Sequence, residues 1–235
     1  MKQSNYAYTT LISGDDYFWG AVCLYFSLKK MKCKYPLILM MNKCSEEIVN
    51  TAYEFATNYT DIIVKEITYD YFRMSGINYY EGTINKFQFL NFKEYDKIMF
   101  LDADVILDQN LDEIFEYNEP YYTYNYDALF EDHSEHRFWG GSFLLRPVDF
   151  DYQEILNTYL DKYLEDELVL LDMLLKKYPE AMEVMEQHTE WHTILYHLKY
   201  WKIFNLYSID RCYQFIESEL YKNSEVGYIQ QRGFY

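Results

Sequence analysis

The sequence predicts an α/β fold in which a mostly parallel central sheet is flanked by helices. Short apolar runs alternate with segments of helical periodicity from residue 6 to residue 64, and such alternation is typical of a parallel sheet covered by helices. A further apolar run, Ile98-Met99-Phe100-Leu101, stops at two aspartates that flank one alanine. Hydrophobic residues make up 50% of the chain and charged residues 25%, so the composition is that of a globular protein.

The first strand and helix are predicted from residues 6–30. Residues 6–12 are largely apolar and have the character of a strand, and Ser13-Gly14-Asp15-Asp16 supplies turn residues and a helix cap. A helix follows, because apolar side chains recur at helical spacing at Tyr17, Ala21, Leu24, Tyr25 and Leu28.

The next elements repeat this alternation. Residues 37–41, after Pro36, predict a second buried strand, and Ser45-Glu46-Glu47 predicts the cap of a helix that runs to about residue 56. Residues 62–64 complete a β-α-β-α-β series. Beyond it we expect a loop over 69–82, helices over 83–92, 111–117, 149–164 and 166–177, and strands over 98–101, 121–126 and 202–206, with a turn into a strand over 138–147.

The domain organisation, the net charge, the cysteines and the hydropathy limit the classes of protein to which the chain can belong. No repeat, linker or change of composition divides the chain, so we expect one domain over residues 1–235. The formal net charge of −17 argues against binding to nucleic acids or to anionic membranes. The four cysteines lack C-x-x-C spacing, which favours reduced thiols. The polar start and the lack of a run of about 18 apolar residues predict a cytoplasmic protein without a membrane span.

The acidic triplet is the strongest candidate for a functional site. Asp102 and Asp104 directly follow a buried strand, and the carboxyl end of a strand is where open α/β sheets bind ligands. If the chain turns there, both carboxylates reach one divalent cation, and oxygen ligands suit Mg²⁺ or Mn²⁺. A solvated acidic turn after a strand explains the triplet alone equally well.

Several segments in their order and spacing resemble one family. They are residues 8–13 with Tyr17 and residues 20–28, Asn85-Lys86-Phe87, Phe100-Leu101-Asp102-Ala103-Asp104, residues 138–147, Asp166-Glu167, and residues 203–206. Together they resemble the family 8 retaining glycosyltransferases, and most closely the glycogenin-like members. The resemblance implies a GT-A fold, a UDP-sugar donor, and Mn²⁺ or Mg²⁺ as cofactor.

The resemblance also implies a role for individual residues. Asp102 and Asp104 would hold the metal, Lys86 would bind the phosphates, and Ala103 lies within the same motif. The residues that match the uridine positions are Leu11, Ser13 and Tyr17.

On the sugar side the chain departs from the family pattern. Trp139 stands where an asparagine is expected, before Gly140, and both would face the donor sugar. Asp166 would contact the donor sugar or the acceptor, and Glu167 would lie near the anomeric carbon. Gln230 stands where the family has a metal-binding histidine, and we take it as the candidate third metal ligand. The alternatives are His188, His192 or His197, or a site that lacks a third ligand from the protein.

The predicted function is therefore a metal-dependent, retaining transfer of a hexose, above all glucose, from a UDP-sugar to a hydroxyl of a carbohydrate or protein. The resemblance extends to self-glucosylation, with Tyr207 and Tyr213 as candidate acceptors, and to a homodimer. A non-catalytic UDP-sugar-binding or scaffold protein of the same fold is the alternative. A nucleotidyltransferase is disfavoured, because residues 13–16 are acidic where a basic, glycine-rich phosphate loop is expected.

Overall fold

The computed structural model describes residues 4–68, 82–107, 109–116, 121–124, 138–159, 173, 176–177, 194–195, 202, 204–219 and 229–230. The chain divides into two compact units. The β1–β3 unit comprises Tyr8–Ile67, Leu101–Glu113 and Glu190–Tyr235, and the β7 unit comprises Met1–Ala7, Thr68–Phe100 and Ile114–Thr189. Each unit is described by itself.

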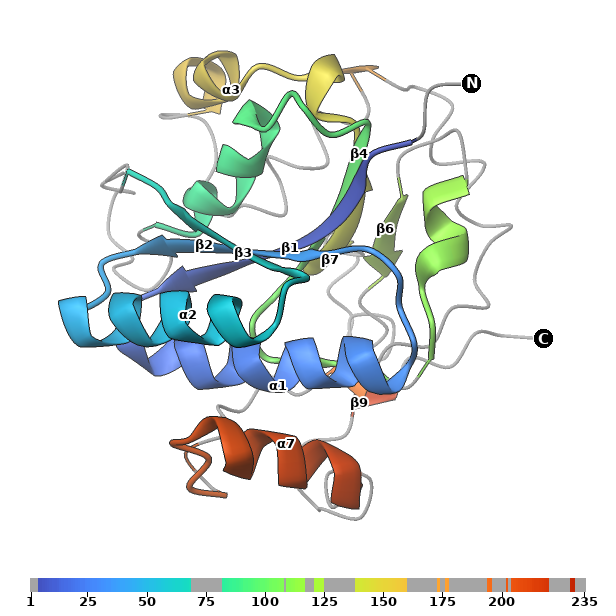
Figure 1. The fold of residues 1–235 in the computed structure, drawn as a ribbon. Helices are drawn as coiled ribbons and strands as arrows, with labels where there is room; N and C mark the ends of the chain where they lie inside the picture. Colours follow the sequence, from blue (N-terminus) through green and yellow to red (C-terminus); the bar gives the residue numbers. More distant parts are fainter. Residues whose placement is uncertain are drawn as a thin grey trace, which may run out of the picture. The chain divides into compact units, whose positions relative to one another are not determined.

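In the β1–β3 unit, the predicted series of parallel strands is confirmed. Strands β1 (Tyr6–Ser13), β2 (Leu37–Asn42) and β3 (Ile62–Glu66) lie in the order β3-β2-β1, and both pairs are parallel. Helices α1 (Phe18–Lys30) and α2 (Glu46–Asn58) lie along the same face of these strands (Figure 1). The expected cap of α2 is also confirmed, because Ser45 Oγ accepts a hydrogen bond from the N–H of Ile48 at 3.4 Å.

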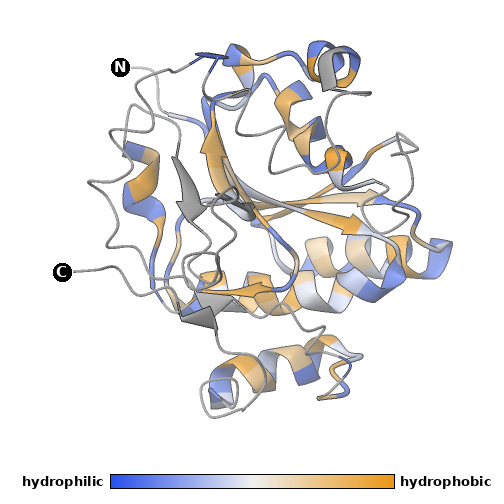
Figure 2. Cartoon of the chain, turned by 180° about the vertical axis from the view of Figure 1, so that it is seen from behind, coloured by the Kyte–Doolittle hydropathy of each residue, from blue (hydrophilic) through white to orange (hydrophobic). Residues whose placement is uncertain are grey.

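The core of this unit consists of the strands and the inner sides of the helices. Every residue of β2 is buried, as expected for a strand covered on both faces. Figure 2 shows β2 mainly in the hydrophobic colours, as its sequence LILMMN requires. Helix α7 (Ile209–Ser218), which the sequence analysis did not predict, packs against α1 and buries Cys212, Phe215 and Ile216.

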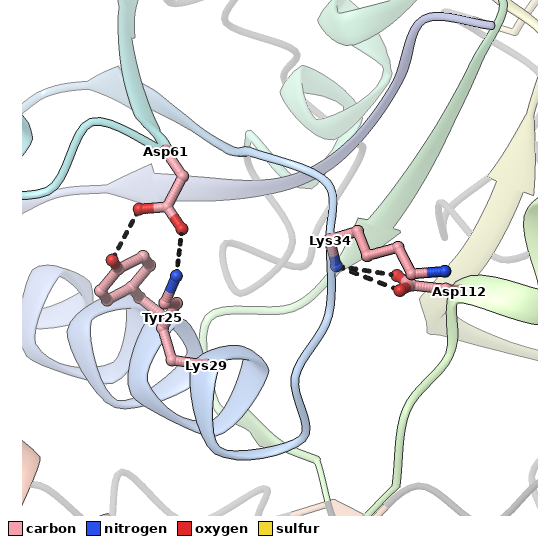
Figure 3. A network of polar contacts seen from close by, with 5 residues as sticks. All are labelled: Tyr25, Lys29, Lys34, Asp61 and Asp112. Atoms are coloured by element: carbon pink, nitrogen blue, oxygen red, sulfur yellow. Dashed lines mark hydrogen bonds and ion pairs between the residues drawn. The ribbon is translucent and has the colours of Figure 1, made fainter.

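Two carboxylates accept hydrogen bonds near the amino-terminal ends of these strands (Figure 3). Asp61, just before β3, accepts hydrogen bonds from Tyr25 Oη and Lys29 Nζ of α1, both at 2.7 Å. Asp112 accepts hydrogen bonds from the N–H of Lys34 at 3.0 Å and from Tyr8 Oη at 2.9 Å. Burial, with Cys33 and Asp112 nearby, raises the pKa of Tyr8, so its hydroxyl stays a donor. Both carboxylates thus have structural partners here.

A small sheet in the same unit was not predicted. Strands β5 (Val105–Ile106), β8 (Ile194–Leu195) and β9 (Ile229–Gln230) pair in the order β5-β8-β9. Both pairs are antiparallel, with Ile106 opposite Ile194 and Ile194 opposite Gln230. Strands of two residues show no periodicity in a sequence, so this sheet could not be read from the pattern of apolar residues.

The β7 unit contains a mixed set of strands in the order β4-β7-β6, comprising β4 (Lys97–Leu101), β6 (Tyr121–Tyr124) and β7 (Phe138–Leu145). β6 and β7 are antiparallel. Phe87, Phe89, Phe100 and Phe143 form an aromatic cluster, in which the rings of Phe100 and Phe143 are stacked with centroids 5.0 Å apart. The helical segments are η2 (Thr83–Asn91), η5 (Pro147–Asp149) and α3 (Tyr152–Tyr159). A further one, η3 (Asp112–Glu116), begins in the β1–β3 unit.

Some local predictions were wrong. The strand expected over 202–206 is absent from the described residues there, because the chain turns and Asn205 takes a positive φ of 54°. The helix expected from residue 149 begins at Tyr152 in the structure, and Asp151 is at its start, where its Oδ1 accepts a hydrogen bond from the N–H of Glu154 at 3.0 Å. The helices expected over 83–92 and 111–117 are confirmed where the chain is described, and both are of the 3₁₀ type. No helix in the described ranges is long and apolar enough to cross a membrane.

Candidate functional site

The acidic triplet forms a tight turn at the end of β4. The carbonyl oxygen of Asp102 accepts a hydrogen bond from the N–H of Val105 at 3.1 Å. Asp102 and Asp104 are half-buried, and Ala103 between them is 4% exposed. A turn closed between the first and fourth residues keeps the first and third close together. The turn that the metal prediction required is therefore present.

The chain that leaves this turn is anchored to α1. Ser27 Oγ accepts a hydrogen bond from the N–H of Leu107 at 3.2 Å and donates one to the carbonyl of Leu24 at 2.7 Å. Ser27 and Leu107 are both fully buried. Because a buried hydrogen bond to a side chain fixes the backbone, this contact holds the segment that follows the two acids.

Strand pairing places Gln230 in the small β5-β8-β9 sheet, whose strand β5 directly follows Asp104. Gln230 lies in β9, two strands from Ile106 of β5, and neighbouring strands are about 4.8 Å apart. Among the described residues, no three His, Cys, Asp or Glu side chains gather where they could hold a metal ion. Two carboxylates and an amide oxygen are nonetheless the hard oxygen ligands that Mg²⁺ and Mn²⁺ accept. The donor set therefore fits the predicted ion, and the liganding roles remain predictions.

The loop after β1 is fixed by two contacts to the β2–α2 connection. Gly14 adopts a φ of 95° and donates its N–H to the carbonyl of Asn42 at 3.0 Å. Asp15 Oδ1 accepts from the N–H of Ser45 at 2.6 Å, so Asp15 does not cap the helix that follows it. Glycine is favoured at position 14 because of this positive φ, which other residues rarely adopt. Space is not the reason, because a Cβ added to Gly14 would meet no atom within 4 Å.

The three predicted uridine residues lie on this loop and strand. Leu11 and Ser13 are half-buried, whereas Ile12 between them is fully buried. Tyr17, also half-buried, ends the short helix η1 (Asp15–Tyr17). Leu11 and Ser13 are therefore on one face of β1 and Ile12 is on the other, which leaves the first two accessible at the carboxyl end of the strand.

A buried amide and a half-buried thiol lie near this loop, and the sequence analysis singled out neither as part of a site. Asn42 ends β2, is 6% exposed, and both polar atoms of its side chain lack a hydrogen-bond partner within the described ranges. The signal in the sequence is a polar residue that closes the apolar run 37–41. Cys44 donates its thiol to the carbonyl of Asn42 at 3.3 Å, and burial raises the pKa of that thiol. A protonated, hydrogen-bonded thiol is a poor nucleophile.

Lys86 belongs to the β7 unit and is described there. It lies on η2, is 5% exposed, and its Nζ is 5.3 Å from the centroid of the Phe100 ring. Neighbours on η2 are held by side-chain amides, because Gln88 Nε2 donates to Asn85 Oδ1 at 2.7 Å and to the carbonyl of Thr68 at 2.6 Å. Lysine is rarely buried to this extent unless it is paired, and the role of Lys86 in phosphate binding stays a prediction.

The remaining predicted residues are only partly described. Trp139 and Gly140 lie in β7, with Trp139 opposite Thr123, so they are in a strand rather than in the expected turn before it. Asp166 and Glu167 lie outside the described residues, as do His188, His192 and His197. All four cysteines are free, as predicted.

Comparisons with known proteins find similarity to proteins whose names describe sugar transfer. A sequence model of the family described as "Mannosyltransferase putative" matches residues 8–188. Galactinol synthase 4 of Arabidopsis thaliana is 31% identical over 134 residues, which cover 53% of this chain and 38% of that protein. Galactinol synthase 1 of Solanum lycopersicum is 27% identical over 185 residues, which cover 67% of this chain and 56% of that protein. The chain thus spans less than two thirds of the length of these relatives.

Solved structures with the same fold are also glycosyltransferases. The galactosyltransferase LgtC, in complex with donor and acceptor sugar analogues, has a TM-score of 0.55 at 16% identity, with 72% of this chain and 70% of that chain covered. GlyE of Streptococcus pneumoniae has a TM-score of 0.53 at 15% identity, with 73% and 44% covered. Likeness at these identities concerns the fold, and it confirms the predicted GT-A fold. The particular likeness to glycogenin stays a prediction.

Proposed function

The chain belongs to this family of putative mannosyltransferases, and we propose that it is a metal-dependent, retaining glycosyltransferase that moves a hexose from a UDP-sugar to a hydroxyl. The observation that carries the proposal is the acidic turn of residues 102–105, with its hydrogen bond from Val105 to Asp102 at 3.1 Å. This turn and Lys86 both fall within the segment that the family model matches. Gln230 lies beyond it.

The residue types suit the departure of a nucleoside diphosphate. A divalent ion held at the turn would neutralise the diphosphate and act as a Lewis acid as the bond between sugar and phosphate breaks. Asp102 and Asp104 are proposed to hold that ion, with Gln230 as the third ligand from the protein. Lys86 supplies a positive charge for the phosphates, and Leu11, Ser13 and Tyr17 are proposed to hold the uridine.

The sugar side of the proposal comes from the family resemblance alone. Trp139 and Gly140 are proposed to face the donor sugar, with Asp166 on its hydroxyls or on the acceptor. Glu167 is proposed to stabilise positive charge at the anomeric carbon. Glucose is the sugar that the resemblance favours, whereas the family description names mannosyl transfer and LgtC is named a galactosyltransferase. A test of donors must therefore include all three hexoses.

The acceptor is proposed to be a carbohydrate or protein hydroxyl, and the chain offers two of its own. Tyr207 is 46% exposed and Tyr213 is 48% exposed, so both phenols are accessible. If self-glucosylation occurs, incubation with UDP-glucose and Mn²⁺ adds hexose units to the protein mass, and the additions disappear in the double variant Tyr207→Phe/Tyr213→Phe. A cytoplasmic location and a homodimer belong to the same proposal.

The deciding experiment measures turnover of UDP-glucose, UDP-galactose and GDP-mannose with and without Mn²⁺. We expect one UDP-sugar to be hydrolysed or transferred only when the metal is present, and the activity to be lost in Asp102→Asn. Glu54→Gln, an exposed acid on α2, is the control and keeps the activity. Tight binding of a UDP-sugar without any turnover would favour the non-catalytic alternative. If the protein neither binds nor turns over a UDP-sugar, the proposal is contradicted.

A further inference from the structure

The side-chain amide of Asn42 is buried without a partner beside the residues predicted to hold uridine. Asn42 is 6% exposed, and neither Oδ1 nor Nδ2 forms a hydrogen bond in the part of the chain that the structure describes. Leaving a buried donor and acceptor unpaired is costly, so such groups in a native fold call for an explanation. A bound ligand that completes both hydrogen bonds is such an explanation.

The strand register shows which face the amide shares. β1 and β2 are parallel, with Ser13 opposite Asn42 and Leu11 opposite Met40. Register partners in neighbouring strands lie on the same face, and successive residues alternate between faces. Asn42 is therefore on the face of Leu11 and Ser13, which are both half-buried where Ile12 is fully buried. This face is accessible at the carboxyl ends of the strands, where open α/β sheets bind ligands.

The backbone that carries the amide is held in place. The carbonyl of Asn42 accepts hydrogen bonds from the N–H of Gly14 at 3.0 Å and from the thiol of Cys44 at 3.3 Å. A recognition group on a fixed backbone loses little freedom when a ligand binds. The amide is thus preorganised, and its two polar atoms are the groups that remain to be satisfied.

We propose that Asn42 recognises the uracil base of the donor by pairing with its imide edge, an inference that rests on the proposed use of a UDP-sugar. Uracil presents an N3–H donor beside the O4 acceptor, and an amide presents the complementary Oδ1 acceptor and Nδ2 donor. A phosphate offers acceptors only and would leave Oδ1 unpaired. The base is therefore the part of the nucleotide that satisfies both amide atoms in one plane.

The variant Asn42→Leu tests the proposal, because leucine has a similar size and no polar atoms. The Kd of UDP with Mn²⁺ is expected to rise about 10- to 100-fold, as a recognition site loses two hydrogen bonds. The thermal midpoint of the ligand-free protein is expected to stay level or to rise, since an unpaired buried amide has been removed. A structural role for Asn42 would instead lower that midpoint.

The matched control is Thr10→Val on the opposite face of β1. Thr10 is fully buried and its Oγ1 lacks a hydrogen-bond partner within the described ranges, so the change again removes one unpaired polar group from the sheet. Thr10 alternates with Leu11 and therefore lies away from the proposed base site. Its UDP affinity is expected to equal that of the wild type.

A modified ligand tests the same contact in the unaltered protein. 3-Methyl-UDP cannot donate from N3, so the wild type is expected to bind it about 10- to 100-fold more weakly than UDP, whereas Asn42→Leu is expected to bind both equally. The proposal is overturned if the wild type binds both nucleotides equally, or if the variant keeps its full affinity for UDP. If the wild type binds neither UDP nor a UDP-sugar, the proposed function fails and this inference fails with it.

Discussion

Asp102 and Val105 are joined by a hydrogen bond of 3.1 Å between the carbonyl of the first and the N–H of the second. This bond converts the end of a buried strand into a turn, and it holds two carboxylates, two positions apart in the sequence, within one tight loop. A carboxylate is costly to bury unless it is paired or bound to a metal, and both acids here are half-buried. The proposed cation site lies at this turn, because carboxylate oxygens are ligands that Mg²⁺ and Mn²⁺ accept.

Replacing either acid is expected to remove the effect of metal on nucleotide binding. In the wild type, Mn²⁺ should tighten UDP binding. In Asp102→Asn or Asp104→Asn that gain should fall by about 100-fold or more, since even indirect partners of metal ligands contribute 10- to 100-fold. Calorimetric titration of UDP with and without Mn²⁺ measures the difference. Equal Mn²⁺ dependence in both variants and in Glu54→Gln would show that the ion binds elsewhere.

Ser27→Ala is expected to destabilise the protein through the segment behind the acids. The change removes the acceptor of the Leu107 N–H, which is fully buried, and an unpaired buried donor costs about 1–3 kcal/mol of unfolding free energy. Ser218→Ala is the matched control, because Ser218 makes the same kind of bond to a carbonyl three residues earlier, at 3.0 Å, on α7. Urea unfolding of both variants should separate them, and equal losses would argue against the anchor.

The sequence predicted well the parts of the fold that depend on long apolar runs. The strands at residues 6–13, 37–42, 62–66 and 97–101 were each marked by a run bounded by turn residues or charges. The strand expected over 202–206 failed because its apolar residues serve a turn, in which Asn205 takes a left-handed φ of 54°. Apolar character alone does not report the backbone angle.

The site was predicted unevenly for a similar reason. The acidic turn was found because its two aspartates follow a clear apolar run and match the metal motif of the family that the chain resembles. Asn42 was missed because an unpaired amide is a property of three-dimensional packing, and an asparagine after a strand is otherwise an ordinary turn residue. The pairing of Gln230 with Ile194 of β8 was also missed. Both strands have only two residues, which is too short for a periodic pattern of apolar residues.

Lys86→Met is expected to weaken the binding of phosphates and to leave the binding of the nucleoside unchanged. Lys86 is 5% exposed and its Nζ lies 5.3 Å from the Phe100 ring centroid, so a methionine of similar length can take its place. Loss of one charge-assisted hydrogen bond should raise the Kd of UDP about 10- to 100-fold. Uridine, which lacks phosphates, should bind both proteins equally, and Lys177→Met on the surface is the control. A parallel loss of uridine binding would indicate a structural role for Lys86.

The contacts of Asp61 predict how stability depends on pH. Burial disfavours its charge, but hydrogen bonds from Lys29 and Tyr25, with the positive charge of Lys29, outweigh burial and hold the pKa of Asp61 below its usual range. A carboxyl with a depressed pKa in the folded state adds stability above the pKa of the unfolded chain, near 3.9. That contribution is lost as the pH falls through the lower folded value.

Asp61→Asn should therefore lower the unfolding free energy near neutral pH, by about 1 kcal/mol, because side-chain exposures of 34% for Asp61 and 50% for Lys29 leave the pair screened by solvent. The gap between wild type and variant should begin to close as the pH falls below about 4, where the carboxyl of the unfolded chain takes up its proton, and should be gone below the lower pKa of the folded protein. Chemical unfolding at a series of pH values between about 3 and 7 measures this gap. Glu54→Gln should show no such closing gap, and a gap of constant size for Asp61→Asn would mean that its effect does not come from the charge.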